Sequence, residues 1–222
     1  MPFQPRFREA AEDLRYLLSR GYNREGAVKF VGDRHQLTRL ERLTLYRAVY
    51  DRETADVHRG KMVPVLALKG RKLTVDGYNV LLTVESLLED RLTVVCDDGF
   101  LRDVSGVHGR HRPTEITERA LKLILELLQK AKPSQVMFSY DAQVSFSGEL
   151  AALTQALLRE YGLHGEAHAV VQADVFALQH GEIVSSSDAV LIGKAKKVVD
   201  LVGEIGRDRF LNKLLTLERR VE

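Results

Sequence analysis

The sequence contains a single cysteine, Cys96, among its 222 residues. One thiol can form neither a disulfide framework nor a thiolate zinc site. Long hydrophobic runs are also absent, because stretches such as 63–68 are far shorter than the roughly 20 residues that cross a bilayer. The first residues include no apolar segment of the signal-peptide type. We therefore expect a cytoplasmic protein without membrane segments.

Several catalytic signatures are missing as well. The sequence has no Walker A loop, no Gly-x-Gly-x-x-Gly fingerprint after a strand, no His-Glu-x-x-His helix and no Gly-x-Ser-x-Gly elbow. The segment Gly193–Lys197 does not have the spacing of a phosphate-binding loop. Kinase, dinucleotide-dependent oxidoreductase, zinc-protease and serine-hydrolase functions are therefore disfavoured.

The chain also lacks an excess of charge of either sign, since 33 Lys and Arg stand against 31 Asp and Glu. The formal net charge of +2 conceals an asymmetry. Residues 1–72 carry 16 basic and 9 acidic side chains, whereas residues 73–222 carry 17 basic and 22 acidic ones. A basic part attracts polyanions, and carboxylates in the acidic part would be compensated by bound cations, so the distribution is compatible with nucleic acid as a partner.

Two kinds of pattern are present along the chain. Up to about residue 60, apolar side chains recur at helical spacing, and Thr38 and Glu41 have the form of a capping box. Residues 1–60 are therefore predicted to be a small, basic, all-helical domain. From residue 61 to 222, β-type and helical runs alternate, which predicts an α/β domain with a mostly parallel sheet and helices on both faces. The expected strands are 62–68, 73–76, 92–96, 135–140, 167–171, 183–185 and 197–201, and a hairpin or tight connection is expected at 69–72. The expected helices are 80–89, 115–130, 148–161, 175–179 and 204–220.

An aspartate ends or follows each of five predicted strands: Asp76, Asp98 (preceded by Asp97), Asp141, Asp174 and Asp188. Ligands of open α/β sheets bind beyond the carboxyl ends of the strands, so these side chains are predicted to share one edge. Each one alone is more often a turn former or a helix N-cap. Clustered like charges, however, repel and are usually compensated by a divalent cation, and oxygen ligands favour Mg²⁺ or Mn²⁺.

The residues Val75-Asp-Gly-Tyr-Asn79, followed by a predicted helix, resemble the opening of PIN-like nucleases and their NYN branch. In segment 173–188 an aspartate opens a helix and a strand ends in a Ser-x-Asp turn, which resembles the later acidic pair of that superfamily. The resemblance covers about residues 72–202 and implies a metal-dependent ribonuclease fold with Asp76, Asp174 and Asp188 as pocket carboxylates. The usual mid-chain glutamate has no clear counterpart, and Glu115, Glu118 and Asp98 are the alternatives. Nearly the whole chain also resembles an uncharacterised prokaryotic family of unknown function.

The implied chemistry is hydrolysis of RNA phosphodiester bonds, in which one or two metal ions activate a water and stabilise charge on the phosphate. The predicted metal ligands are Asp76, Asp98, Asp174 and Asp188. Asp141 is predicted to join Asp76, Asp174 and Asp188 as a catalytic carboxylate. Asn79 is predicted to orient a carboxylate or the water, with a helix N-cap as the equally favoured alternative.

Basic side chains are predicted to hold the nucleic acid. The segment 102–112 is basic and glycine-containing, and phosphate contacts dominate nucleic-acid affinity. Its candidates are Arg102, His108, Arg110, His111 and Arg112, with a solvated surface loop as the alternative. In the helical part, the candidates for an RNA-binding face are Arg34, Arg39, Arg42, Arg47, Tyr22, Tyr46 and Tyr50. The alternative is an amphipathic bundle with inward tyrosines and paired arginines.

The leading hypothesis is thus a Mg²⁺- or Mn²⁺-dependent endoribonuclease with a PIN-like sheet behind a small helical domain. A second hypothesis is a non-catalytic PIN-like module that binds RNA or protein. A third, weaker one is a phosphotransfer or nucleotide-binding domain, suggested by Asp97-Asp98. RNA is the expected partner, and a homodimer is left open.

Overall fold

The first part of the chain is helical, as expected. The computed structural model describes residues 4–104 and 112–217. Its first four helices are α1 (Pro5–Ser19), α2 (Arg24–Arg34), α3 (Arg39–Ala48) and α4 (Arg52–Lys61). The capping box of α3 is confirmed: the Thr38 hydroxyl accepts from the Glu41 amide, and the Glu41 carboxylate accepts from the Thr38 amide at 2.7 Å. Within the described segments, no helix combines the length and the apolar character needed to cross a lipid bilayer.

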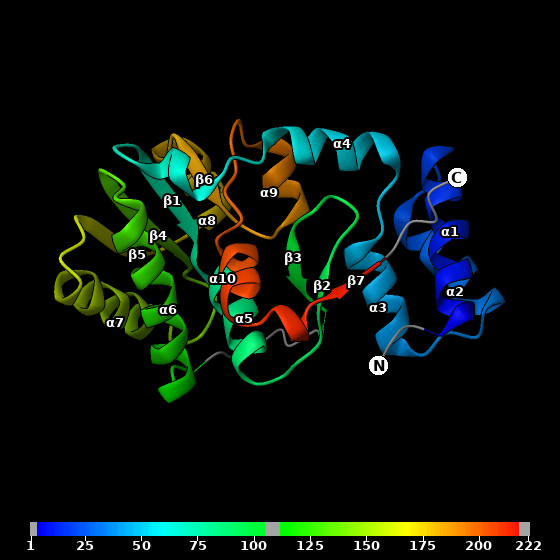
Figure 1. Ribbon diagram of the computed structural model, residues 1–222, viewed down its shortest axis with the longest axis horizontal. Helices are drawn as coiled ribbons and strands as arrows, with labels where there is room; N and C mark the ends of the chain where they lie inside the picture. Colours follow the sequence, from blue (N-terminus) through cyan, green and yellow to red (C-terminus); the bar gives the residue numbers. More distant parts are fainter. Residues whose placement is uncertain (1–3, 105–111, 218–222) are drawn as a thin grey trace.

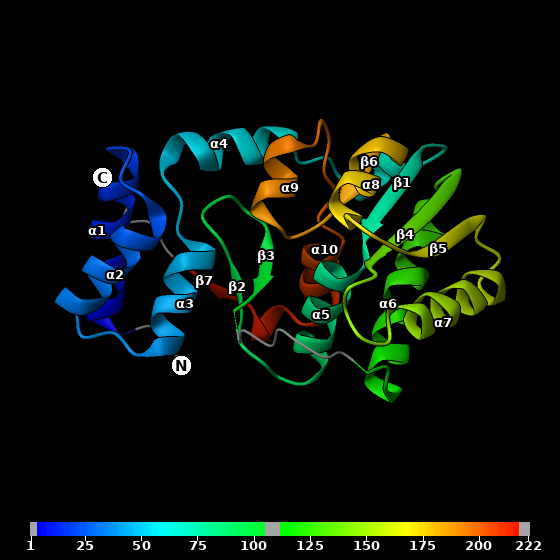
Figure 2. The same cartoon turned by 180° about the vertical axis from the view of Figure 1, so that it is seen from behind.

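The main sheet has four parallel strands in the order β5-β4-β1-β6. They are β1 (Lys72–Asp76), β4 (Gln135–Asp141), β5 (Gly165–Val170) and β6 (Ile183–Ser185). Helices α5 (Gly77–Leu88), α6 (Glu115–Ala131), α7 (Ser147–Glu160) and α10 (Leu201–Arg209) pack together over one face. Helix α8 (Ala173–His180) covers β1, β4 and β5 from the other face and contacts α9 (Ala189–Lys194), as Figures 1 and 2 show from opposite sides. The expected α/β arrangement is confirmed.

A second, three-stranded sheet lies between the helical part and the main sheet (Figure 1). Its strands are β2 (Thr93–Val95), β3 (Leu101–Asp103) and β7 (Leu215–Thr216). Strand β2 pairs antiparallel with β3 and parallel with β7. Val94 and Val104 are buried in the same core as Phe7, Leu14 and Leu45 of the N-terminal helices. The helical part therefore packs on this sheet instead of closing a core by itself.

Three predicted elements are wrong. Residues 62–68 form no strand: after Pro64 the chain makes the short 3-10 helix η1 (Val65–Leu68), so no hairpin follows at 69–72. Proline has no N–H for a ladder, and this single turn packs on α6. At 197–201 only isolated bridges occur at Val198, because Asp200 already caps α10 with a 2.8 Å bond from the Gly203 amide. The helix expected at 204–220 ends at Arg209, and η2 (Leu211–Lys213) and β7 follow.

Gly77 is required by packing against Tyr140. A Cβ atom at Gly77 would lie 2.3 Å from the ring of Tyr140. Tyr140 is fully buried and its hydroxyl lies 2.8 Å from Thr154 Oγ1, so the ring has no room to move. We expect Gly77→Ala to lower the free energy of unfolding by about 1–3 kcal/mol through overpacking, measured by urea denaturation. Gly148→Ala on α7, where no atom lies within 4 Å of the new Cβ, is the matched control, and equal losses in the two variants would contradict this explanation.

Candidate functional site

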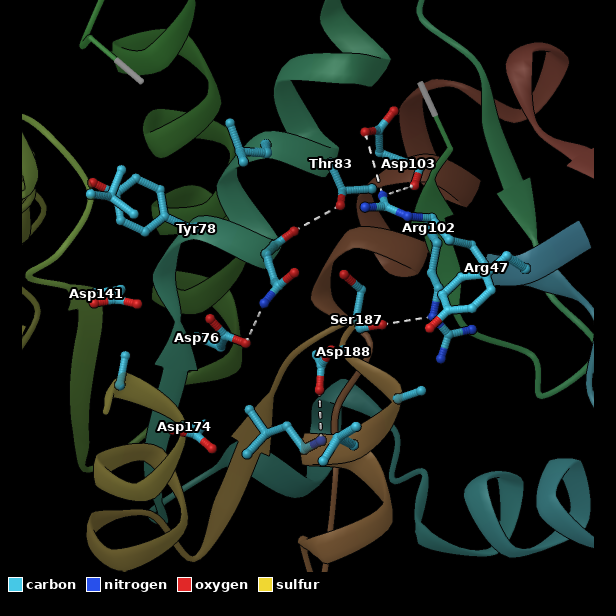
Figure 3. A pocket seen from close by; sticks show the side chains of 18 of the residues that line it. Arg47, Asp76, Tyr78, Thr83, Arg102, Asp103, Asp141, Asp174, Ser187 and Asp188 are labelled. Atoms are coloured by element: carbon cyan, nitrogen blue, oxygen red, sulfur yellow. Dashed lines mark hydrogen bonds and ion pairs between the residues drawn. The ribbon is translucent and has the colours of Figure 1, made fainter. Parts of the chain in front are cut away.

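A cavity of about 830 Å³ opens beyond the carboxyl ends of the main sheet (Figure 3). From β1 the chain adds β4 and β5 on one side and then returns to add β6 on the other, so the strand order reverses beside β1. Doubly wound sheets bind ligands at such a reversal. Asp76, the last residue of β1, lies at this point and lines the cavity.

Four of the five predicted strand-end aspartates share this cavity. Asp76 and Asp141 end β1 and β4, Asp174 lies in the first turn of α8, and Asp188 precedes α9. Figure 3 shows the four carboxylates on one side of the cavity. Their convergence follows from the topology, because parallel strands present their carboxyl ends at one edge. Together they form an acidic wall.

Asp76 is the most perturbed group of the acidic wall. It is only 8% exposed, and its Oδ2 accepts hydrogen bonds from Asn79 Nδ2 and Ser186 Oγ, both at 2.7 Å. Burial raises the pKa of Asp76 to about 6, the nearby charge of Asp188 adds to the increase, and the two hydrogen bonds only partly oppose it. The carboxyl therefore exchanges its proton close to neutral pH.

Asn79 orients the Asp76 carboxylate, which is one of its two predicted roles; it does not act as the N-cap of α5, a position that Asp76 itself occupies. Ser186 was not among the predicted site residues. Its hydroxyl donates to Asp76 and accepts from the Asp188 amide at 2.9 Å, so it links two members of the acidic wall. The available sequence signal was the Ser-x-Asp turn that it begins.

Two other aspartates of the wall also have local structural roles. Asp188 Oδ1 accepts from the Leu191 amide at 2.8 Å and caps α9, and Asp141 Oδ1 accepts from the Gln143 amide at 2.9 Å. The cap-and-turn alternative is therefore correct for these two side chains. This structural role does not exclude a functional one, since both carboxylates line the cavity.

The donor atoms of the wall suit a hard cation, but they do not form a closed cage. Across residues 4–104 and 112–217, no three His, Cys, Asp or Glu side chains are grouped closely enough to hold a metal ion on their own. Mg²⁺ seldom needs such a cage, because it keeps several waters and is held by one or two carboxylates together with substrate phosphates. Asp76 and Asp188, whose charges interact, are the two carboxylates of the wall that could contribute to a site of that kind.

The prediction that Asp98 shares the edge of the main sheet is wrong. Strand β2, which precedes it, belongs to the second sheet. Asp98 is fully buried and accepts two 2.7 Å hydrogen bonds from Arg102 and one at 2.8 Å involving His58 Nδ1. Asp97 likewise accepts two hydrogen bonds from Arg15, so both carboxylates of the Asp97-Asp98 pair are engaged inside the protein.

The predicted nucleic-acid contacts fall in different places. Arg102 lines the cavity but is buried by its pairing with Asp98. Arg39 is exposed outside the cavity, and Arg42 holds the connection between α2 and α3 through Asp33 and the Leu37 carbonyl. Arg112 lies over the ring of Phe146. His108, Arg110 and His111 lie outside the described residues.

A second wall of the cavity is cationic and aromatic. It is formed by Arg24 of α2, Tyr46 and Arg47 of α3, and Tyr50 from the connection between α3 and α4. Figure 3 shows Arg47 across the cavity from Asp76, Asp141 and Asp174, with Asp103, whose carboxylate lies 4.0 Å from Arg47, beside it. Arg47 donates to the Asp103 carbonyl at 2.7 Å, which ties α3 to β3. Of the side chains predicted for an RNA-binding face, Tyr46, Arg47 and Tyr50 line the cavity, whereas Arg39 and Arg42 do not. Helical periodicity separates the faces of a basic helix without indicating which face meets the sheet.

Comparison with known proteins gives a family and no activity. Residues 6–61 match the family described as "Protein of unknown function (DUF434)", and residues 65–204 match "Domain of unknown function (DUF5616)". The chain is 33% identical over 198 residues to "Uncharacterized protein MJ0935" of Methanocaldococcus jannaschii, covering 88% of this chain and 94% of that protein. No solved structure matches the chain. The resemblance to an uncharacterised family is confirmed, and neither family description mentions a nuclease. The chain belongs to the DUF5616 family and carries an N-terminal DUF434 segment.

Proposed function

We propose that this protein is a PIN-like, Mg²⁺- or Mn²⁺-dependent endoribonuclease that hydrolyses RNA in the cavity beyond the main sheet. The observation that supports the proposal most strongly is the convergence of four aspartates from four elements on one cavity that Arg24 and Arg47 also line. Four carboxylates alone would repel a phosphodiester, so the arrangement makes sense for a polyanion only with a cation between them.

The chain's own residues have distinct tasks in this proposal. Asp76 and Asp188 would hold the metal ion, with Asp141 and Asp174 beside them on the same wall. When bound, the ion supplies Lewis-acid stabilisation of the phosphate and lowers the pKa of a bound water. Ser186 and Asn79 hold Asp76 Oδ2 in one orientation. Because the pKa of Asp76 is raised to about 6, its carboxylate is available at neutral pH and is protonated in mild acid.

The test is cleavage of a labelled RNA in Mn²⁺ by the wild type and by Asp188→Asn. Asparagine is as good an N-cap as aspartate, so α9 is expected to persist. We expect the variant to lose about 100-fold in rate, because replacing even the residues that only orient metal ligands typically costs about 10- to 100-fold. Asp208→Asn, an exposed aspartate on α10 outside the cavity, is the control and should cleave normally. Undiminished cleavage by Asp188→Asn would contradict the proposal.

A non-catalytic RNA-binding module is the second candidate, and the lack of a clear counterpart to the mid-chain glutamate of PIN-like nucleases favours it. It predicts that the wild type binds RNA equally well in Mn²⁺ and in EDTA and cleaves in neither. Titration with Mn²⁺ alone, followed by isothermal calorimetry, separates the two candidates. Heat of binding that disappears in Asp188→Asn supports the ribonuclease, and no heat for the wild type supports the module.

A further inference from the structure

The cationic and aromatic wall is held rigidly by Arg24. Its Nη1 donates to the carbonyls of Tyr46 at 2.9 Å and Val49 at 2.7 Å, which are carbonyls at the C-terminal end of α3. The guanidinium carbon lies 4.6 Å from the ring centroid of Tyr50 and 5.9 Å from that of Tyr46. A guanidinium fixed by two carbonyls and two rings has lost its freedom before any ligand arrives, which lowers the entropic cost of binding.

Arg24 makes no direct hydrogen bond to a carboxylate among the described residues, although its charge interacts with that of Asp51, the N-cap of α4. The two tyrosines differ in access: Tyr50 is 4% exposed and its ring contacts the guanidinium groups of both Arg24 and Arg102, whereas Tyr46 is 40% exposed. Tyr50 therefore supports the wall, and Tyr46 presents an aromatic surface at the cavity next to a fixed positive charge.

An exposed aromatic ring beside a guanidinium matches the chemistry of an unpaired nucleotide. A base stacks on the ring and its phosphate contacts the cation. In a duplex the bases are stacked on one another and cannot reach such a ring. The same cavity contains the acidic wall, so a nucleotide on Tyr46 would belong to the strand whose phosphate reaches Asp76.

We propose that Tyr46 and Arg24 form a subsite for one unpaired nucleotide beside the acidic wall, and that this subsite makes the protein select single-stranded over double-stranded RNA. Tyr46 stacks on the base, and Arg24 contacts the adjoining phosphate. The role of this selection in cleavage rests on the proposed ribonuclease function, whereas the binding itself does not.

The test measures binding without cleavage. All variants of the full-length protein carry Asp76→Asn, and fluorescence anisotropy follows a labelled single-stranded RNA of about ten nucleotides and the blunt duplex of the same sequence. Stacking contributes about 1–3 kcal/mol per base, so Tyr46→Ala should weaken single-strand binding about 5- to 150-fold. Tyr46→Phe keeps the ring and should restore the affinity. Binding of the duplex should change little.

Tyr16 and Arg20 on α1 provide a matched control. Tyr16 is 60% exposed, the Arg20 guanidinium carbon lies 5.3 Å from its ring centroid, and neither residue lines the cavity. Tyr16→Ala should leave single-strand binding unchanged. The subsite is overturned if Tyr46→Ala weakens binding no more than Tyr16→Ala, or if it weakens duplex binding equally.

Failure of the subsite and failure of the ribonuclease proposal give different results. If the wild type never cleaves RNA but Tyr46→Ala still lowers single-strand affinity selectively, the subsite stands and the ribonuclease proposal fails. If cleavage depends on Asp188 but Tyr46→Ala binds like the control, only the subsite fails.

Discussion

Asp76→Asn is expected to make the protein more stable at pH 7 in EDTA while abolishing RNA cleavage. Burial raises the pKa of Asp76 from 3.8 to about 6, so the charged form is disfavoured in the folded protein. A shift of this size corresponds to a cost of roughly 3 kcal/mol at pH 7, when the carboxylate is charged in both states. Asparagine carries no charge, and its carbonyl can accept the hydrogen bonds from Asn79 and Ser186. Opposite effects on stability and activity are typical of a functional group that the fold retains at a cost.

The difference in stability between the wild type and Asp76→Asn should depend on pH. Because the pKa of Asp76 is higher in the folded state, the destabilisation of the wild type is fully present above about pH 6 and disappears as the pH falls below about 4. Urea denaturation in EDTA should therefore show Asp76→Asn more stable at pH 7 and the two proteins nearly equal at pH 4. A difference that stays constant over this range, or a less stable variant at pH 7, would show that the Asp76 charge is not disfavoured.

A divalent cation should remove most of the stability difference between the wild type and Asp76→Asn. An ion that binds the folded wild type at 100 times its Kd adds about 2.7 kcal/mol to the free energy of unfolding. Mn²⁺ is therefore expected to stabilise the wild type and to have much less effect on Asp76→Asn, as measured by thermal unfolding. Asp208→Asn, whose carboxylate is exposed, should respond to Mn²⁺ like the wild type. An equal response of the wild type and Asp76→Asn would place the cation elsewhere.

The second large effect is expected at Asp98. Asp98→Ala leaves the guanidinium of Arg102 buried without its counter-charge, and removing one partner of such a pair costs about 3–5 kcal/mol. Asp56→Ala is the matched control, because Asp56 forms its ion pairs with Arg52 and Arg59 on an exposed face of α4 and should contribute less than about 1 kcal/mol. Urea denaturation at pH 7 measures both. A loss at Asp98 no larger than at Asp56 would contradict the prediction.

The loss of folding stability at low pH should also depend on Asp98. Burial alone would raise the pKa of Asp98, but hydrogen bonds from His58 and Arg102 outweigh it and lower the pKa to about 2. The stabilisation is therefore fully present above about pH 4 and is lost as the pH falls through 2. The wild type should lose stability in this range, and Asp98→Ala should not show the same loss.

This buried pair also supports the acidic wall. Arg102 Nε donates to the Ser187 carbonyl at 2.6 Å, and Ser187 precedes Asp188. The loop that carries Asp188 is thus fixed on one side by Arg102 and on the other by Ser186, which bonds to Asp76. Loss of Asp98 is expected to loosen this loop, so Mn²⁺ binding by Asp98→Ala should weaken even under conditions where the variant is folded.

Much of the acidic wall could be predicted from the sequence for a simple reason. The strands of the main sheet are recognisable from short apolar runs, and parallel strands place their carboxyl ends at one edge whatever their order. The aspartates at 76, 141, 174 and 188 therefore converge without any knowledge of the partners of each strand. The capping box of α3 is equally local, since its two hydrogen bonds join residues three apart.

The environment of Asp98 and the cavity wall opposite the aspartates depended on contacts between residues distant in the sequence. The strand before Asp98 looks like the others, but its pairing with Leu215 places it in a different sheet, and His58 and Arg102 then enclose the carboxylate. The N-terminal helices contain many arginines, and only tertiary contacts determine which of them line the cavity. Arg47 is placed there by its bond to the Asp103 carbonyl and Arg24 by its bonds to the end of α3, whereas Arg39 lies outside. The sequence by itself thus determined the acidic wall, because strand ends are a local property. The tertiary structure alone decided what faces that wall, because the side chains there are positioned by packing between segments that no local pattern connects.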